Sequence, residues 1–206
     1  MKPTLRLLKT RPPPDAQAWE ERVQAELRQG DGGAAADLYE RLAPVVDRAL
    51  LRLFGGRDAE HDDLVQSTFE QLVLTLVRGR FAGGCSLETW VTRIATHLGL
   101  NVMRSRTTER RHVEREASEE VVSAVAARDG RRDADTWAEV EELRRQLLYL
   151  DPVKAETLFL HDVLGHSLSE IAVMMRVSVA AAQSRLVRGR RELEARIEAS
   201  RKAEVP

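Results

Sequence analysis

The chain has 206 residues, enough for one or two small domains, and 43% of them are hydrophobic and 32% charged, as in a globular protein with many exposed helices. The formal net charge of −1 argues against tight non-specific DNA binding by the isolated chain. A single cysteine, Cys85, excludes an intramolecular disulfide, and no apolar run approaches the length of a membrane span.

The first half of the chain is predicted to form a small helical domain over residues 15–106, preceded by a loose tail over residues 1–14 that ends in three prolines. Helices are expected from Asp15 to the glycines at 30–33, over 34–54 with a kink at Pro44, after an acidic entry over Asp58–Asp63, and over 87–106. Each shows apolar residues at three- and four-residue steps. These stripes include Trp19, Val23 and Leu27, then Leu38, Leu42 and Val46, then Val65, Phe69 and Leu72, then Trp90, Ile94 and Leu98.

Two polar helix faces in this domain are candidate binding surfaces. The third predicted helix places three polar residues opposite its apolar stripe, namely Asp63, Gln66 and Glu70. The fourth helix carries polar and positive groups at steps of four, four and three, namely Arg93, His97, Asn101 and Arg104. This spacing predicts that the four side chains share one exposed face.

Residues 107–136 are predicted to be a flexible acidic linker, because apolar periodicity is lost there. Residues 114–142 carry ten acidic residues against four arginines. Such a segment has little apolar surface with which to dock. We therefore expect the two flanking domains to move independently unless a partner fixes them.

Residues 137–200 are predicted to form a second helical domain with a helix-turn-helix, followed by a tail over 201–206. Ser167 and Glu170 have the spacing of a capping box, so a short helix is expected from Leu168. Ser178 can cap a longer helix whose apolar stripe includes Val179, Ala182, Leu186 and Leu193. The predicted fold class is therefore all-α, with two small helical domains.

The longer helix has a basic face that suits DNA. Residues 185–191 contain four arginines and no acidic residue. Arginine neutralises phosphates and can bind a guanine edge through two hydrogen bonds. The candidate DNA-binding residues are Gln183, Ser184, Arg185, Arg188 and Arg191. An ordinary amphipathic helix with a solvated basic face is the alternative interpretation.

Two distant blocks of sequence resemble one family. The first contains Asp63-Leu64-Val65-Gln66-Ser67-Thr68-Phe69 and Thr89-Trp90-Val91-Thr92-Arg93-Ile94-Ala95. The second contains Leu168-Ser169-Glu170-Ile171-Ala172 and Ser184-Arg185-Leu186. In this order, on either side of a polar linker, they resemble the bacterial extracytoplasmic-function (ECF) sigma factors.

The resemblance implies a role for each candidate surface. Asp63, Gln66 and Glu70 would dock on the coiled-coil clamp of the largest subunit of core RNA polymerase. The helix with Arg93, His97, Asn101 and Arg104, together with the loop over 81–86, would meet the minus-ten promoter element, and the helix from Val179 the minus-thirty-five element. Core polymerase and promoter DNA are thus the implied partners, with an inhibitory anti-sigma factor as a further candidate, and the cytoplasm is the expected location.

The chain departs from the family pattern at several positions. His97 stands where asparagine is frequent, and Thr92 where a longer polar or aromatic residue is frequent. The usual Thr-Val-Lys at the start of the DNA-reading helix is Ala181-Ala182-Gln183, which removes a hydroxyl and a positive charge. Arg176 replaces a glycine common in the turn. We expect this helix to bind DNA weakly by itself.

Other functions fit the sequence less well. No phosphate loop, nucleophile elbow or paired-carboxylate motif is visible, so the protein is not expected to be an enzyme or to bind a cofactor. The five histidines and Cys85 lack metal-ligand spacing. Two alternatives remain: a free-standing helix-turn-helix regulator that binds DNA without polymerase, and an adapter that keeps the fold but has lost DNA reading.

Overall fold

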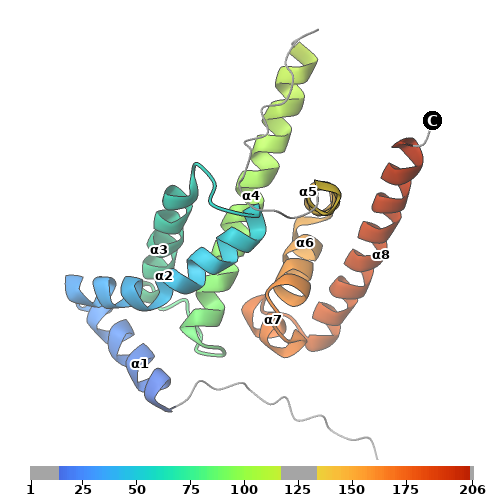
Figure 1. Cartoon of the computed structure of the whole chain (residues 1–206). Helices are drawn as coiled ribbons and strands as arrows, with labels where there is room; N and C mark the ends of the chain where they lie inside the picture. Colours follow the sequence, from blue (N-terminus) through green and yellow to red (C-terminus); the bar gives the residue numbers. More distant parts are fainter. Residues whose placement is uncertain (1–13, 117–133, 205–206) are drawn as a thin grey trace, which may run out of the picture.

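The structure, a computed structural model, describes residues 14–116 and 134–204, with side chains over 16–109 and 138–202 (Figure 1). Regular structure in these residues is helical throughout, so the predicted all-α class is confirmed. The first domain comprises α1 (Pro14–Arg28), α2 (Gly32–Phe54), α3 (His61–Val77) and α4 (Leu87–Glu116). The second comprises α5 (Ala134–Leu148), α6 (Pro152–Leu158), a π-helical turn η1 (Phe159–Val163), α7 (Leu168–Met174) and α8 (Val179–Glu204).

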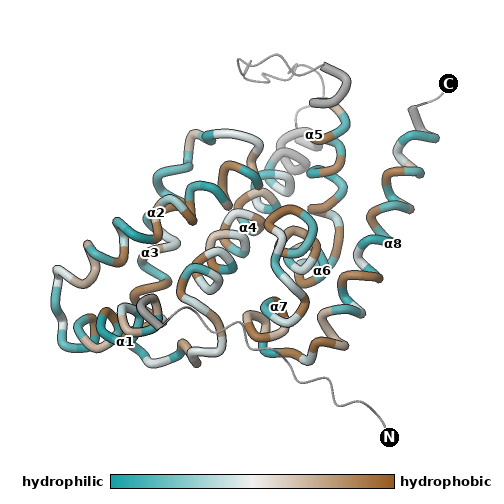
Figure 2. The backbone as a smooth tube through the Cα atoms, turned by 60° about the horizontal axis from the view of Figure 1, so that its bottom comes forward, coloured by the Kyte–Doolittle hydropathy of each residue, from teal (hydrophilic) through white to brown (hydrophobic). Residues whose placement is uncertain are grey.

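The predicted apolar stripes form the core of the first domain, and they are visible as recurring brown segments along the helices in Figure 2. Leu38, Leu42 and Val46 of α2 are fully buried. Helix α4 approaches α2 so closely that an ideal Cβ at Gly99 would lie 2.4 Å from Leu53 Cδ2. A side chain at this position would therefore displace the core of α2.

Local signals set the ends of α2. Asp31 precedes the helix, and its side chain accepts a hydrogen bond of 2.8 Å from the backbone N–H of Gly33. The helix ends at Gly55, whose φ of 76° is the left-handed conformation that glycine adopts readily. The chain is helical on both sides of Pro44. The helix therefore begins two residues earlier than the predicted range of 34–54, since the Asp31 cap admits Gly32 and Gly33.

The second domain contains the predicted helix-turn-helix. Ser167 Oγ accepts from the N–H of Glu170 at 3.2 Å, and Glu170 Oε2 accepts from the N–H of Ser167 at 2.9 Å, so the capping box is confirmed. Ser178 Oγ accepts from the N–H of Ala181 at 3.1 Å in the first turn of α8. Helix α8 packs on α6 at Gly189, where an ideal Cβ would lie 3.0 Å from Leu158 Cδ1.

The predicted linker of residues 107–136 is helical at both ends. Helix α4 continues through residues 107–116, and α5 begins at Ala134. Neither glycine nor proline interrupts residues 107–116, and the hydroxyls of Thr107 and Thr108 bond to the carbonyls four residues earlier. The tail over 1–13 and the segment 117–133, which holds the remainder of the predicted linker, lie outside the described residues.

The two domains pack directly against each other, with α4 (green in Figure 1) between α1–α3 on one side and α5–α8 on the other. Leu53 and Leu100 of the first domain join a buried cluster with residues of the second, namely Leu147, Leu150, Ala155, Leu158 and Phe159. Ile171, Ala172 and Met174 of α7 join the core of the first domain. The expectation that only a partner could hold the domains together is therefore wrong, because the apolar contact comes from α5–α7 rather than from the linker.

Candidate functional site

The three polar residues predicted on α3 lie on one exposed face. Asp63, Gln66 and Glu70 point to solvent, whereas Leu64, Val65, Phe69 and Leu72 are buried. Gln66 Nε2 donates to Glu70 Oε1 at 2.9 Å, which fixes these two side chains relative to each other. The face therefore presents carboxylates on a helix whose opposite side is committed to the core.

An open apolar pocket of about 780 Å³ adjoins this face between α2 and α3. Tyr39 and Leu74 line it and are 49% and 50% exposed, while Gln66 and Glu70 form part of its rim. The Tyr39 ring packs against the Phe69 ring at a tilt of 49°, with 4.7 Å between the ring centroids. Tyr39 and Leu74 were not predicted as site residues. Both are large apolar side chains that fall outside the buried stripe of their own helix. That pattern is the sequence signal that could have identified them.

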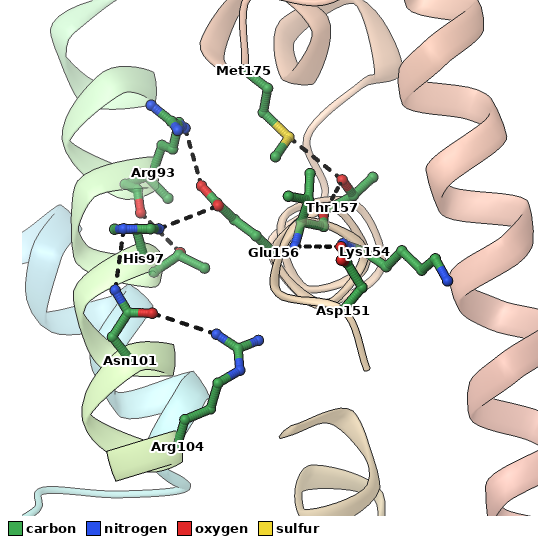
Figure 3. A network of polar contacts seen from close by, with 12 residues as sticks. Arg93, His97, Asn101, Arg104, Asp151, Lys154, Glu156, Thr157 and Met175 are labelled. Carbon is green, nitrogen blue, oxygen red and sulfur yellow. Dashed lines mark hydrogen bonds and ion pairs between the residues drawn. The ribbon is translucent and has the colours of Figure 1, made fainter. Parts of the chain in front are cut away.

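The four residues predicted on α4 do share one face, but part of that face is turned towards the second domain (Figure 3). Arg93 Nε donates to Glu156 Oε1 at 3.0 Å, and His97 Nδ1 lies 3.4 Å from Glu156 Oε2. Asn101 Nδ2 lies 3.1 Å from His97 Nε2, and Arg104 Nη1 donates to Asn101 Oδ1 at 3.5 Å. The expectation of a freely exposed face is therefore wrong for Arg93 and Arg104, which are both half-buried.

Arg104 lies at the far end of this series. Its Nε and Nη2 atoms are buried and have no hydrogen-bond partner among the described residues. Burial lowers the pKa of Arg104, while the carboxylates of Glu156 and Asp151 oppose that change. Two carboxylates of the second domain, Glu156 and Asp151, thus act on the positive groups of α4.

The loop before α4 does not offer its aromatic ring to a ligand. Phe81 is buried and packs edge-on against Trp90, with 5.7 Å between ring centroids. Cys85 is buried, and burial raises the pKa of its thiol to about 12, which keeps it protonated and unreactive. In the loop expected to meet the minus-ten element, Phe81 is therefore a core residue, because its ring completes the core.

Helix α8 presents most of its predicted DNA-binding residues to solvent. Gln183, Arg188 and Arg191 are exposed, whereas Ser184 and Arg185 are half-buried. Arg188 Nε donates to Ser184 Oγ at 3.0 Å, which orients the guanidinium along the helix. Arg190, by contrast, donates from Nε to Asp162 Oδ2 at 2.9 Å and so belongs to a contact within the second domain.

The atypical residues of the helix-turn-helix have distinct structural roles. Ala182 is fully buried, so it is a packing residue of α8 rather than a lost DNA contact. Arg176 has a φ of 53°, the left-handed conformation for which glycine is usual. Its Nη2 donates to the carbonyl oxygen of Arg80 in the first domain at 2.7 Å. Arginine in this turn therefore gains an interdomain hydrogen bond that glycine could not form.

Within residues 14–116 and 134–204, no cluster of three or more His, Cys, Asp or Glu side chains could hold a metal ion. No helix in the described part of the chain is sufficiently long and apolar to span a membrane.

Comparison with known proteins identifies two family matches. Residues 38–109 match the family described as sigma-70 region 2, and residues 140–193 match sigma-70, region 4. The first segment covers α2–α4 up to residue 109, and the second runs from α5 into α8.

Individual relatives extend the similarity over most of the chain. RNA polymerase sigma factor CarQ of Myxococcus xanthus is 34% identical over 173 residues, which are 81% of this chain and 91% of CarQ. RNA polymerase sigma factor NccH of Alcaligenes xylosoxydans xylosoxydans is 28% identical over 187 residues, 88% of this chain and 96% of NccH. The solved structure of CnrH in complex with the cytosolic domain of CnrY is similar with a TM-score of 0.51 and 25% identity, covering 88% of this chain and 98% of CnrH.

Proposed function

Since the chain belongs to the ECF sigma factors of the sigma-70 family, we propose that three of its helical surfaces share the task of promoter recognition. A member of this family is a non-enzymatic factor that binds core RNA polymerase and directs transcription initiation at promoter DNA. The observation that carries the assignment is the order of the matched segments, region 2 over 38–109 followed by region 4 over 140–193. We place its action in the cytoplasm, together with RNA polymerase.

The first surface is the α3 face of Asp63, Gln66 and Glu70, which we assign to core polymerase. Its exposed carboxylates and the adjoining pocket with Tyr39 and Leu74 combine charge with apolar area. Such a mixture is typical of protein–protein interfaces, where an apolar centre is surrounded by polar groups. The coiled-coil clamp of the largest subunit is the proposed partner.

The second surface is the face of α4 with Arg93, His97, Asn101 and Arg104, which we assign to the minus-ten element. Guanidinium, imidazole and amide groups can bind phosphates and the edges of unstacked bases. The third surface is α8, which follows the turn of a helix-turn-helix and so corresponds to the helix that enters the major groove. Gln183, Ser184, Arg185, Arg188 and Arg191 are its proposed DNA contacts.

We propose residues 15–106 as the domain for polymerase and the minus-ten element and 137–200 as the domain for the minus-thirty-five element. Residues 107–136 are the proposed linker, although α4 extends into it as far as Glu116 and α5 begins within it at Ala134. The similar protein CnrH is solved with the cytosolic domain of CnrY bound to it. This supports an inhibitory protein partner, of the anti-sigma kind, for the present chain.

The function is tested by run-off transcription from promoters captured with the protein in its native cell, with and without core polymerase. We expect transcripts only when chain and core are both present. Tight, sequence-specific DNA binding by the isolated protein at physiological salt would instead identify a free-standing regulator.

Asp63→Lys tests the polymerase surface. Asp63 is exposed but lies in the first turn of α3, so its replacement by lysine should lower stability by about 1–2 kcal/mol through the helix dipole. We nevertheless expect loss of co-purification with core polymerase, since the charge of the proposed contact is reversed. Glu21→Lys, an exposed charge reversal on α1, is the matched control and should co-purify normally. Unchanged co-purification of Asp63→Lys would contradict the assignment.

A further inference from the structure

We propose that Glu20 of α1 is a positioning residue for minus-ten recognition, because it holds the junction at which the loop over 81–86 passes into α4. The proposal rests on the proposed function, since it concerns the surface that we assign to the minus-ten element. It adds to that surface a helix, α1, that lies outside the matched segment of 38–109. Glu20 acts through α4 and does not contact DNA itself, because it is only 7% exposed.

The contact that carries the proposal is a hydrogen bond between the two helices. The backbone N–H of Leu87, the first residue of α4, donates to Glu20 Oε1 at 2.8 Å. Leu87 is fully buried. The first N–H groups of a helix have no acceptor within the helix, and a buried N–H without an acceptor is costly. A carboxyl oxygen from α1 therefore completes the N-terminus of α4.

The residue that caps α4 from within the loop serves other N–H groups. Ser86 Oγ accepts from the N–H of Thr89 at 3.1 Å, and the Ser86 carbonyl oxygen accepts from the N–H of Trp90 at 3.0 Å. These bonds satisfy the third and fourth residues of α4, whereas the N–H of Leu87 bonds to Glu20. The two caps are thus complementary, and the one from Glu20 ties the junction to a separate helix.

The helix that carries Glu20 is itself anchored on α2. Trp19, the preceding residue, donates from Nε1 to Asp37 Oδ2 at 3.0 Å. The guanidinium carbon of Arg41 lies 4.2 Å from the centroid of the Trp19 indole ring. Glu20 therefore reaches the start of α4 from a helix whose own position is fixed by α2.

A fixed junction matters because both segments assigned to the minus-ten element meet there. The loop ends at Ser86, and Arg93 and His97 follow on α4 two and three turns later. Groups that bind unstacked bases discriminate between them only when they are held in place before the DNA arrives. Without the acceptor on α1, the junction must shift so that the Leu87 N–H can reach water. We therefore expect the loss to fall on selectivity for the minus-ten element, while α8 reads its own element as before.

Glu20→Leu tests this role, since leucine fills a similar volume but offers no acceptor. The assay is run-off transcription by the full chain with core polymerase, from a promoter captured in the native cell. Two sets of single-base variants of that promoter cover the minus-ten and the minus-thirty-five elements. Selectivity is the transcript from the captured sequence divided by that from each variant, a ratio from which the fraction of folded protein cancels.

We expect Glu20→Leu to reduce minus-ten selectivity by about tenfold, as for the loss of one buried hydrogen bond, and to leave minus-thirty-five selectivity unchanged. Glu20→Gln should retain the wild-type ratios, because its amide oxygen can still accept from Leu87. Val23→Ala is the structural control. Val23 is fully buried on α1, so its truncation should lower the yield of folded protein without changing either ratio.

Glu20→Asp keeps the experiment decisive if Glu20→Leu does not fold. Its carboxyl is withdrawn from Leu87 by one methylene, so minus-ten selectivity should fall in the same direction.

Three results would overturn the proposal while leaving the sigma-factor function intact. They are unchanged ratios in the Glu20 variants that lose the acceptor, an equal fall in both promoter sets, and a fall in Glu20→Gln as large as in Glu20→Leu. If the wild-type chain with core polymerase gives no transcript from any captured promoter, the proposed function fails, and this proposal fails with it.

Discussion

At the scale of single residues, Gly99 limits how closely α4 can cross α2. An ideal Cβ there would lie 2.4 Å from Leu53 Cδ2 and 3.3 Å from a ring carbon of Phe54. We expect Gly99→Ala to lower the free energy of unfolding by about 1–3 kcal/mol, since overpacking exceeds the gain in helix propensity. Gly32→Ala is the control, because a Cβ there meets nothing within 4 Å. Urea denaturation measures both; a Gly99→Ala variant as stable as wild type would refute the close approach.

Glu20 shows how burial couples stability to pH. Burial raises the pKa of its carboxyl above 4.5, while the hydrogen bond from the Leu87 N–H acts in the opposite direction. The folded protein therefore keeps this proton to higher pH than the unfolded chain does. The carboxyl's contribution to stability is greatest below the unfolded pKa and declines as pH rises through the folded pKa.

Glu20→Gln should remove this dependence, because the amide oxygen can still accept from Leu87 but does not titrate. We expect the unfolding free energy of the variant to rise relative to wild type as pH increases from 4.5 through the folded pKa. Urea denaturation across a pH series measures the difference. Glu40→Gln, at an exposed position of α2, is the control, because Glu40 is not among the charges that act on Glu20. A constant difference between Glu20→Gln and wild type at every pH would contradict the pKa shift.

Interactions between residues close together in the sequence could be predicted from it, whereas interactions between distant residues could not. The capping box of Ser167 and Glu170 depends on atoms three residues apart, so its pattern predicts its geometry. The ion pair between Arg93 and Glu156 joins residues in different domains, and no local pattern points to it. Glu156, which is buried, was not among the predicted site residues.

At the scale of helices, periodicity predicted the elements well and their ends less well. The stripes of α2, α3 and α4 are buried as expected, because an amphipathic helix has only one face that can join a core. The end of α4 was missed, because an exposed polar helix and a polar linker have similar composition over 107–116. The cationic face of α4 is partly buried because the second domain packs against it. Helix periodicity does not predict such contacts between domains.

The arginines of α8 provide the test at this scale. We expect Arg188→Ala and Arg191→Ala to weaken holoenzyme binding at all promoters alike and to reduce the salt slope by about 0.9 per lost phosphate contact. Arg185→Ala should instead relax preference at one base position, with a cost of about 1–3 kcal/mol if it reads a guanine. Titration of promoter DNA over a range of salt concentrations distinguishes the two patterns.

Arg190→Ala is the matched control for this series. It removes the same charge from the same helix, but Arg190 is engaged by Asp162 of the second domain. Its loss should leave the salt slope of promoter binding nearly unchanged. A slope that falls equally for Arg190→Ala and Arg188→Ala would mean that net charge, and not the exposed face of α8, determines the binding.

At the scale of the whole molecule, the family resemblance and the two blocks that carry it were evident from the sequence, whereas the domain arrangement was not. Matches to regions 2 and 4 confirm the family resemblance. The assembly depends on buried apolar residues such as Leu53 and Leu100, and helix periodicity does not indicate which neighbour such residues meet. The candidate DNA surfaces were therefore identified as residues, and the partial burial of one of them required the structure.

Leu53 links the two domains and offers a test of their mutual dependence. It is 1% exposed on α2 but packs in a cluster with Leu147, Leu158 and Phe159 of the second domain. Leu53→Ala should lower stability by about 2–5 kcal/mol, as for other buried leucines. Because the lost contacts cross the interface, amide hydrogen exchange in α6 should accelerate even though the substitution lies in the first domain.

Leu76→Ala is the comparison, since Leu76 is equally buried on α3 but belongs to the cluster centred on the first domain. It should destabilise the first domain to a similar extent with a smaller effect on α6. Mass spectrometry of exchanged peptides covering 152–163 measures the difference. If α6 exchanges at the same rate in both variants, the two domains do not stabilise each other through Leu53. Accelerated exchange with Leu53→Ala alone would show that the first domain stabilises α6, the helix that carries Glu156.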